Sequence, residues 1–187
     1  MANEALLVMD VQQGIVERFA PRAEGLLDAL ERAIDAARQA WIPVVYVRIA
    51  FRPGAPEVSR RNRAFAAVAQ ASGFGDQDEA TQIHARIAPQ PGDVVVLKKR
   101  VSAFAGSDLD VVLRSLQVET LVLTGIATSG VVLSTLRQAA DLDYGLAVLR
   151  DGCADGDDEV HRVLLDKVFA RQATVLTVDE WVASVAS

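Results

Sequence analysis

Two charged residues in this sequence are placed for proton-transfer chemistry, each directly after an apolar run. Asp10 follows the apolar residues 6–9, and Lys98 follows the apolar residues 94–97. A carboxyl group at the edge of a dry core can transfer protons, and a lysine that leaves a buried strand needs a counter-ion. We therefore expect Lys98 to pair with Asp10. The alternative is that each is an ordinary charge at a strand end.

A third segment, residues 125–130, offers backbone groups instead of side chains. It reads Gly-Ile-Ala-Thr-Ser-Gly and joins an apolar run to a stretch with helical periodicity. Such small residues let backbone N–H groups point toward the strand end, where they can hold an anion or stabilise an oxyanion. A tight helix start capped by Thr128 or Ser129 is the plainer interpretation, and the two are compatible.

The elements that must position these groups are six short runs rich in Val, Leu and Ile. Most are continuous and not alternating, which is typical of parallel strands buried on both faces. Between them, apolar residues recur at helical spacing, as at Leu26, Leu30 and Ile34. This alternation predicts an α/β fold, three-layer α-β-α with a six-stranded, mostly parallel sheet, whose carboxyl edge binds ligands. The expected strands span residues 5–9, 44–49, 94–97, 120–124, 146–149 and 174–178.

One long segment, residues 51–92, interrupts the alternation because it has no strong strand signal. An excursion of this length in a small domain is usually a lid over a site, an oligomer contact or both. The alternative is a solvated helix with loops on either side. The segment carries Arg52, Arg60, Arg61 and Arg63.

Length and charge restrict the class of protein. The chain has 187 residues and a net charge of -6, which fits a single acidic domain over residues 1–187. The acidic balance argues against nucleic acid as a partner, and no apolar run approaches the ~20 residues that span a membrane. The N-terminus has no basic region followed by a cleavage site, so we expect a cytoplasmic protein that acts on a small molecule.

The residue inventory argues against several kinds of site. One cysteine, Cys153, and two histidines, His84 and His161, support neither a disulfide framework nor a metal cluster. We therefore predict no metal and no cofactor. The 125–130 glycines form neither a dinucleotide-binding fingerprint nor a phosphate loop, and no serine elbow occurs. A flavodoxin-like nucleotide binder, which shares the sheet type, is one alternative.

Three ordered motifs resemble those of the isochorismatase-like hydrolase superfamily, also called cysteine hydrolases. They are Leu-Val-Met-Asp-Val-Gln at 7–12, Lys-Lys-Arg-Val-Ser-Ala-Phe at 98–104, and Thr-Gly-Ile-Ala-Thr-Ser-Gly-Val-Val-Leu-Ser-Thr at 124–135. The similarity runs over essentially the whole chain. It implies an isochorismatase-like, Rossmann-like fold and hydrolysis of a small substrate.

The family's catalytic set of Asp, Lys and Cys maps only in part onto this chain. By motif the Asp is Asp10 and the Lys is Lys98, with Lys99 as the less favoured register. The Cys position holds Val131, which has no nucleophilic atom and cannot form an acyl-enzyme. Cys153 follows the next strand, where the family has no nucleophile, and we interpret it as a small residue in a Gly-Cys-Ala turn.

The resemblance also implies a mechanism without a thiol. Some isochorismatases cleave a vinyl ether with a proton donor and water. By that analogy Asp10 would protonate the substrate carbon, Lys98 would orient and tune Asp10, and water would add to the cation. A raised pKa of Asp10 would suit this role, whereas Lys98 lowers that pKa, and the sequence leaves the balance open. The expected substrate is small and bears a carboxylate or an enol ether.

Further features come with the resemblance. A homo-oligomer, dimer or tetramer, is implied, with residues 51–92 and the helix from Val131 as contact surfaces. The nicotinamidase-type metal motif, an Asp with two histidines, has no counterpart here.

The alternative function is a catalytically silent member that binds a small acidic or amide ligand. The site is further expected to include an oxyanion wall of Ile126, Ala127, Gly130 and Val131, a cis peptide bond between Ile126 and Ala127, and Gln12 and Arg52 as substrate-binding residues.

Overall fold

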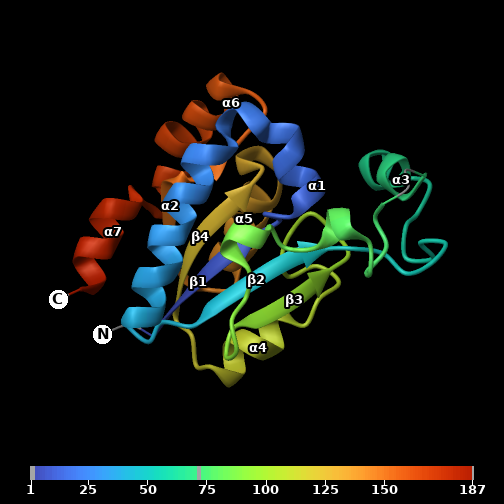
Figure 1. Ribbon diagram of the computed structural model, residues 1–187. Coiled ribbons are helices and arrows are strands. Elements are labelled where there is room, and N and C mark those ends of the chain that lie inside the picture. The colour runs from blue at the N-terminus through green and yellow to red at the C-terminus, as the bar shows by residue number, and fades with distance from the viewer. Residues whose placement is uncertain (1–2, 71–72, 187) are drawn as a thin grey trace.

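The computed structural model describes residues 3–70 and 73–186, with a six-stranded sheet at its centre (Figure 1). The strand order is β3-β2-β1-β4-β5-β6, and every neighbouring pair is parallel. The chain therefore starts in the middle, winds to one edge and then crosses to the other. The predicted α/β fold is confirmed, with a wholly parallel sheet. The strands are β1 (Glu4–Met9), β2 (Val44–Ile49), β3 (Val94–Lys98), β4 (Thr120–Ile126), β5 (Gly145–Ala154) and β6 (Thr174–Leu176).

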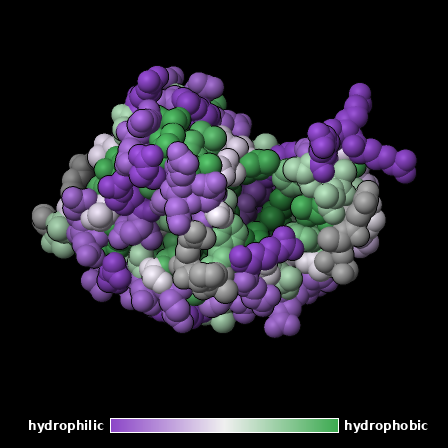
Figure 2. Space-filling model, turned by 90° about the horizontal axis from the view of Figure 1, so that it is seen from above, coloured by the Kyte–Doolittle hydropathy of each residue, from purple (hydrophilic) through white to green (hydrophobic). Residues whose placement is uncertain are grey.

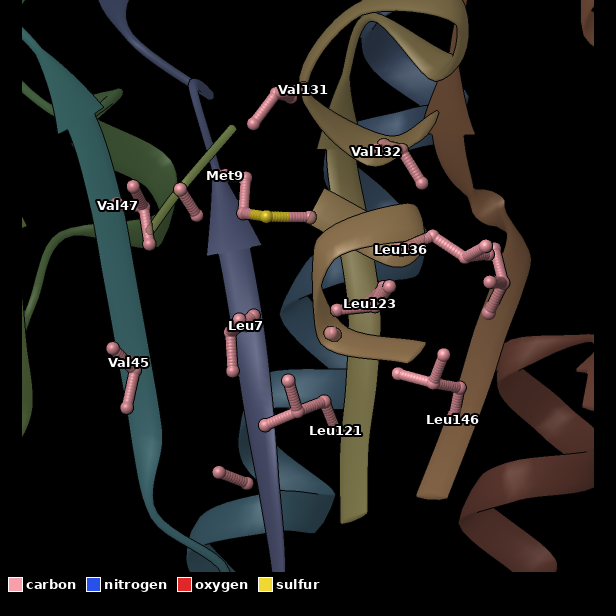
Figure 3. Packing of buried hydrophobic residues seen from close by; sticks show 14 of the residues in the cluster. Leu7, Met9, Val45, Val47, Leu121, Leu123, Val131, Val132, Leu136 and Leu146 are labelled. Carbon is pink, nitrogen blue, oxygen red and sulfur yellow. The ribbon is translucent and has the colours of Figure 1, made fainter. Parts of the chain in front are cut away.

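Helices cover both faces of the sheet (Figure 1). One apolar cluster joins α2 and α7 to the sheet through residues such as Leu30 and Trp181. A second cluster joins α4 and α5 to the other face through Leu113 and Leu136, and Figure 3 shows part of it. No helix in the described part of the chain is both long and apolar enough to cross a bilayer. The helices are α1 (Gln13–Val16), α2 (Ala20–Gln39), α3 (Arg63–Gln70), α4 (Leu109–Ser115), α5 (Leu133–Asp141), α6 (Asp158–Val163) and α7 (Val178–Val185).

The last two strands differ most from their predicted bounds. β5 continues to Ala154, well beyond residue 149, and pairs there with Ile126 of β4. β6 stops at Leu176 and not at residue 178, because Thr177 is the N-cap of α7 and forms a capping box with Glu180. The longer β5 brings the residues after Ala154 beside the end of β4.

Residues 51–70 and 73–75 belong to a lobe that projects from the body and contains α3 (Figure 1). A β-bridge joins Phe51 to Gly75, and the Phe51 amide donates to the Phe74 carbonyl at 2.8 Å, which closes the lobe at its base. The rings of Phe51 and Phe65 pack edge to face with their centroids 5.9 Å apart. As predicted, the described residues of the 51–92 segment add no strand to the sheet. A lid or oligomer role for the segment stays a prediction.

Candidate active site

Asp10 lies at the carboxyl end of the central strand β1. Its φ of 57° is in the left-handed region, which Asp tolerates better than most residues, so the extended strand stops there. The Asp10 amide donates to the carbonyl of Val47 in β2 at 2.8 Å. These constraints hold the carboxyl group at the edge of the sheet, where it is only 6% exposed.

Lys98 is the last residue of the edge strand β3, and its side chain reaches across the end of β2 to Asp10. Nζ lies 2.8 Å from Oδ2 of Asp10 and donates to the carbonyls of Arg100 at 3.0 Å and Val101 at 3.1 Å. All three donors of the ammonium group therefore have acceptors. The residue is 1% exposed. The predicted Asp10–Lys98 ion pair is confirmed.

The neighbouring Lys99 points away from this pair. Its Nζ donates to the carbonyl of Ala50 at 2.5 Å and lies 3.6 Å from Oε1 of Glu57. Successive side chains at the end of a strand point to opposite faces, so only one of the two lysines can reach Asp10. The geometry agrees with the motif spacing, which favoured Lys98.

Two opposing effects set the charge of Asp10. Burial raises the pKa of its carboxyl group, and the Lys98 ammonium lowers that pKa by charge and by hydrogen bonding. Burial is the larger effect, so the pKa of Asp10 lies above its ordinary value. Oδ1 of Asp10 is buried and has no hydrogen-bond partner in the described part of the chain. The fold therefore favours a protonated Asp10 relative to an exposed aspartate, with Oδ1 open to carry the proton.

The turn after β4 begins where two strands approach closely. Gly125 has a φ of 137°, and a Cβ at this position would collide with the carbonyl oxygen of Met9, so only glycine fits. The next peptide bond, between Ile126 and Ala127, is cis, as the resemblance implied. The turn therefore starts beside the end of β1, from which Asp10 emerges.

A π-helical turn, η4 (Thr128–Val132), follows the cis bond and leads into α5. Gly130 and Val132 both donate to the carbonyl of Ala127, at 3.0 and 3.3 Å. The amide of Val131 lies between them in the chain. Of the predicted wall, Gly130 thus uses its amide within the turn, and anion binding by the Val131 amide stays a prediction.

The side chain of Val131 is part of the apolar core. It is 2% exposed and belongs to the cluster that contains Met9 and Leu123. Figure 3 shows Val131 above Met9, at the carboxyl end of β1. An isopropyl group offers no electron pair for attack on a carbonyl carbon. The position to which the resemblance assigns the family's nucleophile is therefore buried and apolar, beside the strand end that carries Asp10.

Cys153 does not replace the missing thiol. It lies in β5 opposite Gly125, its Sγ is 3.9 Å from the carbonyl oxygen of Leu123, and burial raises the pKa of its thiol to about 12. Since the thiolate is the nucleophilic form, this sulfur is unreactive. We expect Cys153→Ala to leave the hydrolytic rate unchanged and the native thiol to resist iodoacetamide. Rapid alkylation of the folded protein, or loss of activity in a folded variant, would contradict this.

Gln12, predicted to bind substrate, binds main-chain groups in the structure. Its amide donates to the carbonyls of Ile49 at 2.9 Å and Thr81 at 2.7 Å, and its oxygen accepts from the Ile49 amide at 2.8 Å. Both amide hydrogens are therefore used on main-chain carbonyls. Gln12 ties the end of β2 to the segment after the lobe and keeps no free donor for a ligand.

Arg52, the other predicted substrate-binding residue, is not brought to the ion pair. Its side chain is largely exposed and lies 3.6 Å from Oε1 of Glu57. It lines a cavity of about 1000 Å³ whose walls include neither Asp10 nor Lys98. The sequence placed Arg52 correctly after β2, but the lobe carries it away from the acid and the amine.

The surface of the molecule is hollowed beside the lobe. Figure 2, which looks down on the carboxyl ends of the strands, shows a hollow between the body and the lobe with apolar residues at its base. A partly apolar hollow with a few polar groups suits a small organic ligand. The described residues contain no group of three or more His, Cys, Asp or Glu that could hold a metal ion.

Two residues that the sequence analysis left without a role contact the turn. Oδ2 of Asp155 accepts from the Ser129 amide at 2.7 Å, and Nδ1 of His161 lies 2.7 Å from Oγ1 of Thr128. Their only signal in the sequence is that they follow the fifth strand, where loops line a site. Which of these residues reach the turn depends on where β5 ends. The sequence did not predict that end correctly.

Comparisons with known proteins agree with this architecture. The isochorismatase domain model matches residues 4–180. The ureidoacrylate amidohydrolase of Variovorax paradoxus (strain S110) is 33% identical over 211 residues, covering 99% of this chain and 82% of that protein. The cysteine hydrolase from Pseudomonas syringae pv. phaseolicola 1448A has a TM-score of 0.89 at 25% identity, covering 98% and 92% of the two chains. The N-carbamoylsarcosine amidase from Thermoplasma acidophilum has a TM-score of 0.80 at 28% identity, covering 96% and 98%.

Proposed function

Because this chain belongs to the isochorismatase family of hydrolases, we propose that it hydrolyses a small substrate by acid–base chemistry of Asp10 and Lys98. The observation that carries the proposal is the buried ion pair, 2.8 Å long, in which one carboxyl oxygen is engaged and the other is open. Val131 supports a mechanism without a covalent intermediate, since it offers no nucleophile. The amidohydrolases among the relatives make amides the competing substrate class.

In the proposed reaction Asp10 is the proton donor. Its proton passes to the electron-rich carbon of an enol ether and leaves an oxocarbenium ion. Water adds to this cation and returns a proton to the Asp10 carboxylate, and the resulting hemiketal breaks its C–O bond to release an alcohol and a carbonyl compound. Lys98 stays protonated throughout. It holds Oδ2 and stabilises the carboxylate that forms when the proton leaves.

The turn after β4 is proposed to bind an anionic group of the substrate. The Val131 amide lies between those of Gly130 and Val132 in a buried, apolar surrounding, where a hydrogen bond to a carboxylate is strong. Ile126 and Ala127 are proposed to complete this wall. A small molecule with a carboxylate beside an enol ether would satisfy both the turn and the acid.

Activity is expected to fall as pH rises through the raised pKa of Asp10. A general acid acts in its protonated form, and burial moves the loss of that proton to higher pH than in an exposed aspartate. A profile of kcat/KM against pH on a vinyl ether substrate checks this. A rate that rises as Asp10 ionises would show that the residue acts as a base instead.

A panel of small vinyl ethers and amides tests the proposed function itself. Turnover of a vinyl ether supports the acid–base mechanism, whereas turnover of amides alone would contradict it. Ligand binding without turnover of either class would favour the catalytically silent alternative. The homo-oligomer and the cytoplasmic location are proposals that sedimentation and cell fractionation would test.

A further inference from the structure

Asp155 is a buried carboxylate outside the Asp10–Lys98 pair. It comes directly after β5 and is 7% exposed. Oδ2 accepts from the Ser129 amide at 2.7 Å, and Oδ1 accepts from the Asp157 amide at 3.3 Å. Each oxygen therefore binds a backbone donor, one in the turn after β4 and one in its own loop. The carboxylate fastens the two segments together.

The turn that Asp155 contacts lacks a cap from its own sequence. The residue that precedes η4 is Ala127, and its side chain makes no capping hydrogen bond. The first amides of a helix need acceptors from elsewhere, and a negative charge there also interacts favourably with the helix dipole. Asp155 provides that acceptor from the loop that follows the neighbouring strand β5. The charged acceptor makes this hydrogen bond stronger than a neutral one.

The pairing of β4 with β5 explains why Asp155 is the residue in this position. Ile126 pairs with Ala154, so Asp155 is the first residue beyond the last pair and lies beside the start of the turn. The same segment makes a second contact through His161, which bonds Thr128. The long β5 thus places its following loop against the turn.

We propose that Asp155 is a positioning residue that holds the turn so that the Val131 amide can bind the substrate's anionic group. Ser129 is two residues before Val131, and the amides on either side of Val131, those of Gly130 and Val132, bind the Ala127 carbonyl. Without Asp155 the Val131 amide would sample other orientations. The consequence for catalysis rests on the proposed function, whereas the effect on the turn does not.

Three variants separate the hydrogen bond from the charge. Asp155→Ala removes the acceptor, and Asp155→Asn keeps an acceptor oxygen of similar shape but removes the charge. Glu159→Gln is the matched control, because it removes one negative charge from an exposed residue of the nearby α6. All three are compared at a temperature where thermal unfolding shows each protein to be folded.

Backbone NMR provides a measurement that needs no turnover. In Asp155→Ala we expect the Ser129 amide to exchange with solvent about 10-fold faster or more, since its acceptor is lost. Acetate serves as the carboxylate probe and should shift the Val131 amide resonance in the wild type, in Asp155→Asn and in Glu159→Gln, but not in Asp155→Ala. Unchanged Ser129 exchange, or an acetate response that is equal or absent in all four proteins, would overturn the inference.

Kinetics then test the catalytic consequence with whichever substrate the panel identifies. Misplacement of a binding group by about 1 Å costs on the order of 100-fold in rate, so kcat/KM should fall about 10- to 100-fold in Asp155→Ala and recover in Asp155→Asn. Faster exchange with unchanged kcat/KM would make Asp155 a structural cap and overturn its positioning role. If the wild type turns over nothing, the proposed function fails, while the acetate comparison still decides whether Asp155 orients the turn.

Discussion

Asp10→Asn is expected to lower the rate of hydrolysis by about 10²- to 10⁴-fold, the contribution typical of a general acid. Asn preserves the shape of the side chain and an oxygen acceptor for Lys98, but its amide has no acidic proton to transfer to a substrate. Lys98 also keeps the carbonyls of Arg100 and Val101, so the fold should persist. Steady-state kinetics on the vinyl ether that the wild type turns over give the ratio, and circular dichroism shows that the variant is folded.

Asp143→Asn is the matched control for this substitution. Asp143 also has a positive φ, 64°, but its side chain is exposed and it lies outside the three motifs. The same change of charge at a similar backbone conformation should leave the rate at the wild-type level. A folded Asp10→Asn protein that retains the wild-type rate would remove Asp10 from the mechanism.

Val131→Cys is expected to create a covalent amidase activity that the native chain lacks. The substitution places a thiol at the carboxyl end of β1, the strand that Asp10 follows, and next to the amide of residue 131. Lys98 and the amide favour the thiolate, which is the attacking form. Mass spectrometry after mixing with a small amide should show an acyl adduct, and release of ammonia or amine should show turnover.

The neighbouring residue provides the control for that variant. Val132 is also fully buried, and Figure 3 shows its side chain in a different part of the apolar cluster from Val131. Val132→Cys adds a thiol of the same kind without access to the ion pair, so we expect neither adduct nor turnover. A folded Val131→Cys protein that forms no adduct would show that this turn no longer supports covalent catalysis.

Much of the fold could be predicted because parallel strands buried on both faces must be apolar throughout. The run Val44–Ile49 coincides with β2, in which every residue except the half-buried Arg48 is buried. The predicted ends of β5 and β6 were less accurate than those of β2, for local reasons. β5 continues through Asp151 and Gly152, which are poor strand residues that a periodicity argument rejects, and Thr177 caps a helix where the apolar pattern continued.

The candidate site was predictable where chemistry depends on residue type next to a strand end. Asp10 and Lys98 stand out because a charge directly after a buried run needs a partner, and the partner is at the same edge of the sheet. Gln12 and Arg52 were less predictable, because a polar residue in a loop has the same sequence signal whether it binds a ligand or a main-chain carbonyl.

By itself the sequence predicted the architecture, the pairing of Asp10 with Lys98 and, through the resemblance, a nucleophile position held by Val131, since each follows from side-chain type and spacing along the chain. Tertiary structure alone decided that desolvation outweighs the ammonium at Asp10, that Gln12 binds main-chain carbonyls, and that Asp155 caps the turn. These three features depend on the distances between groups far apart in sequence and on how deeply those groups are buried. The local sequence pattern specifies neither quantity.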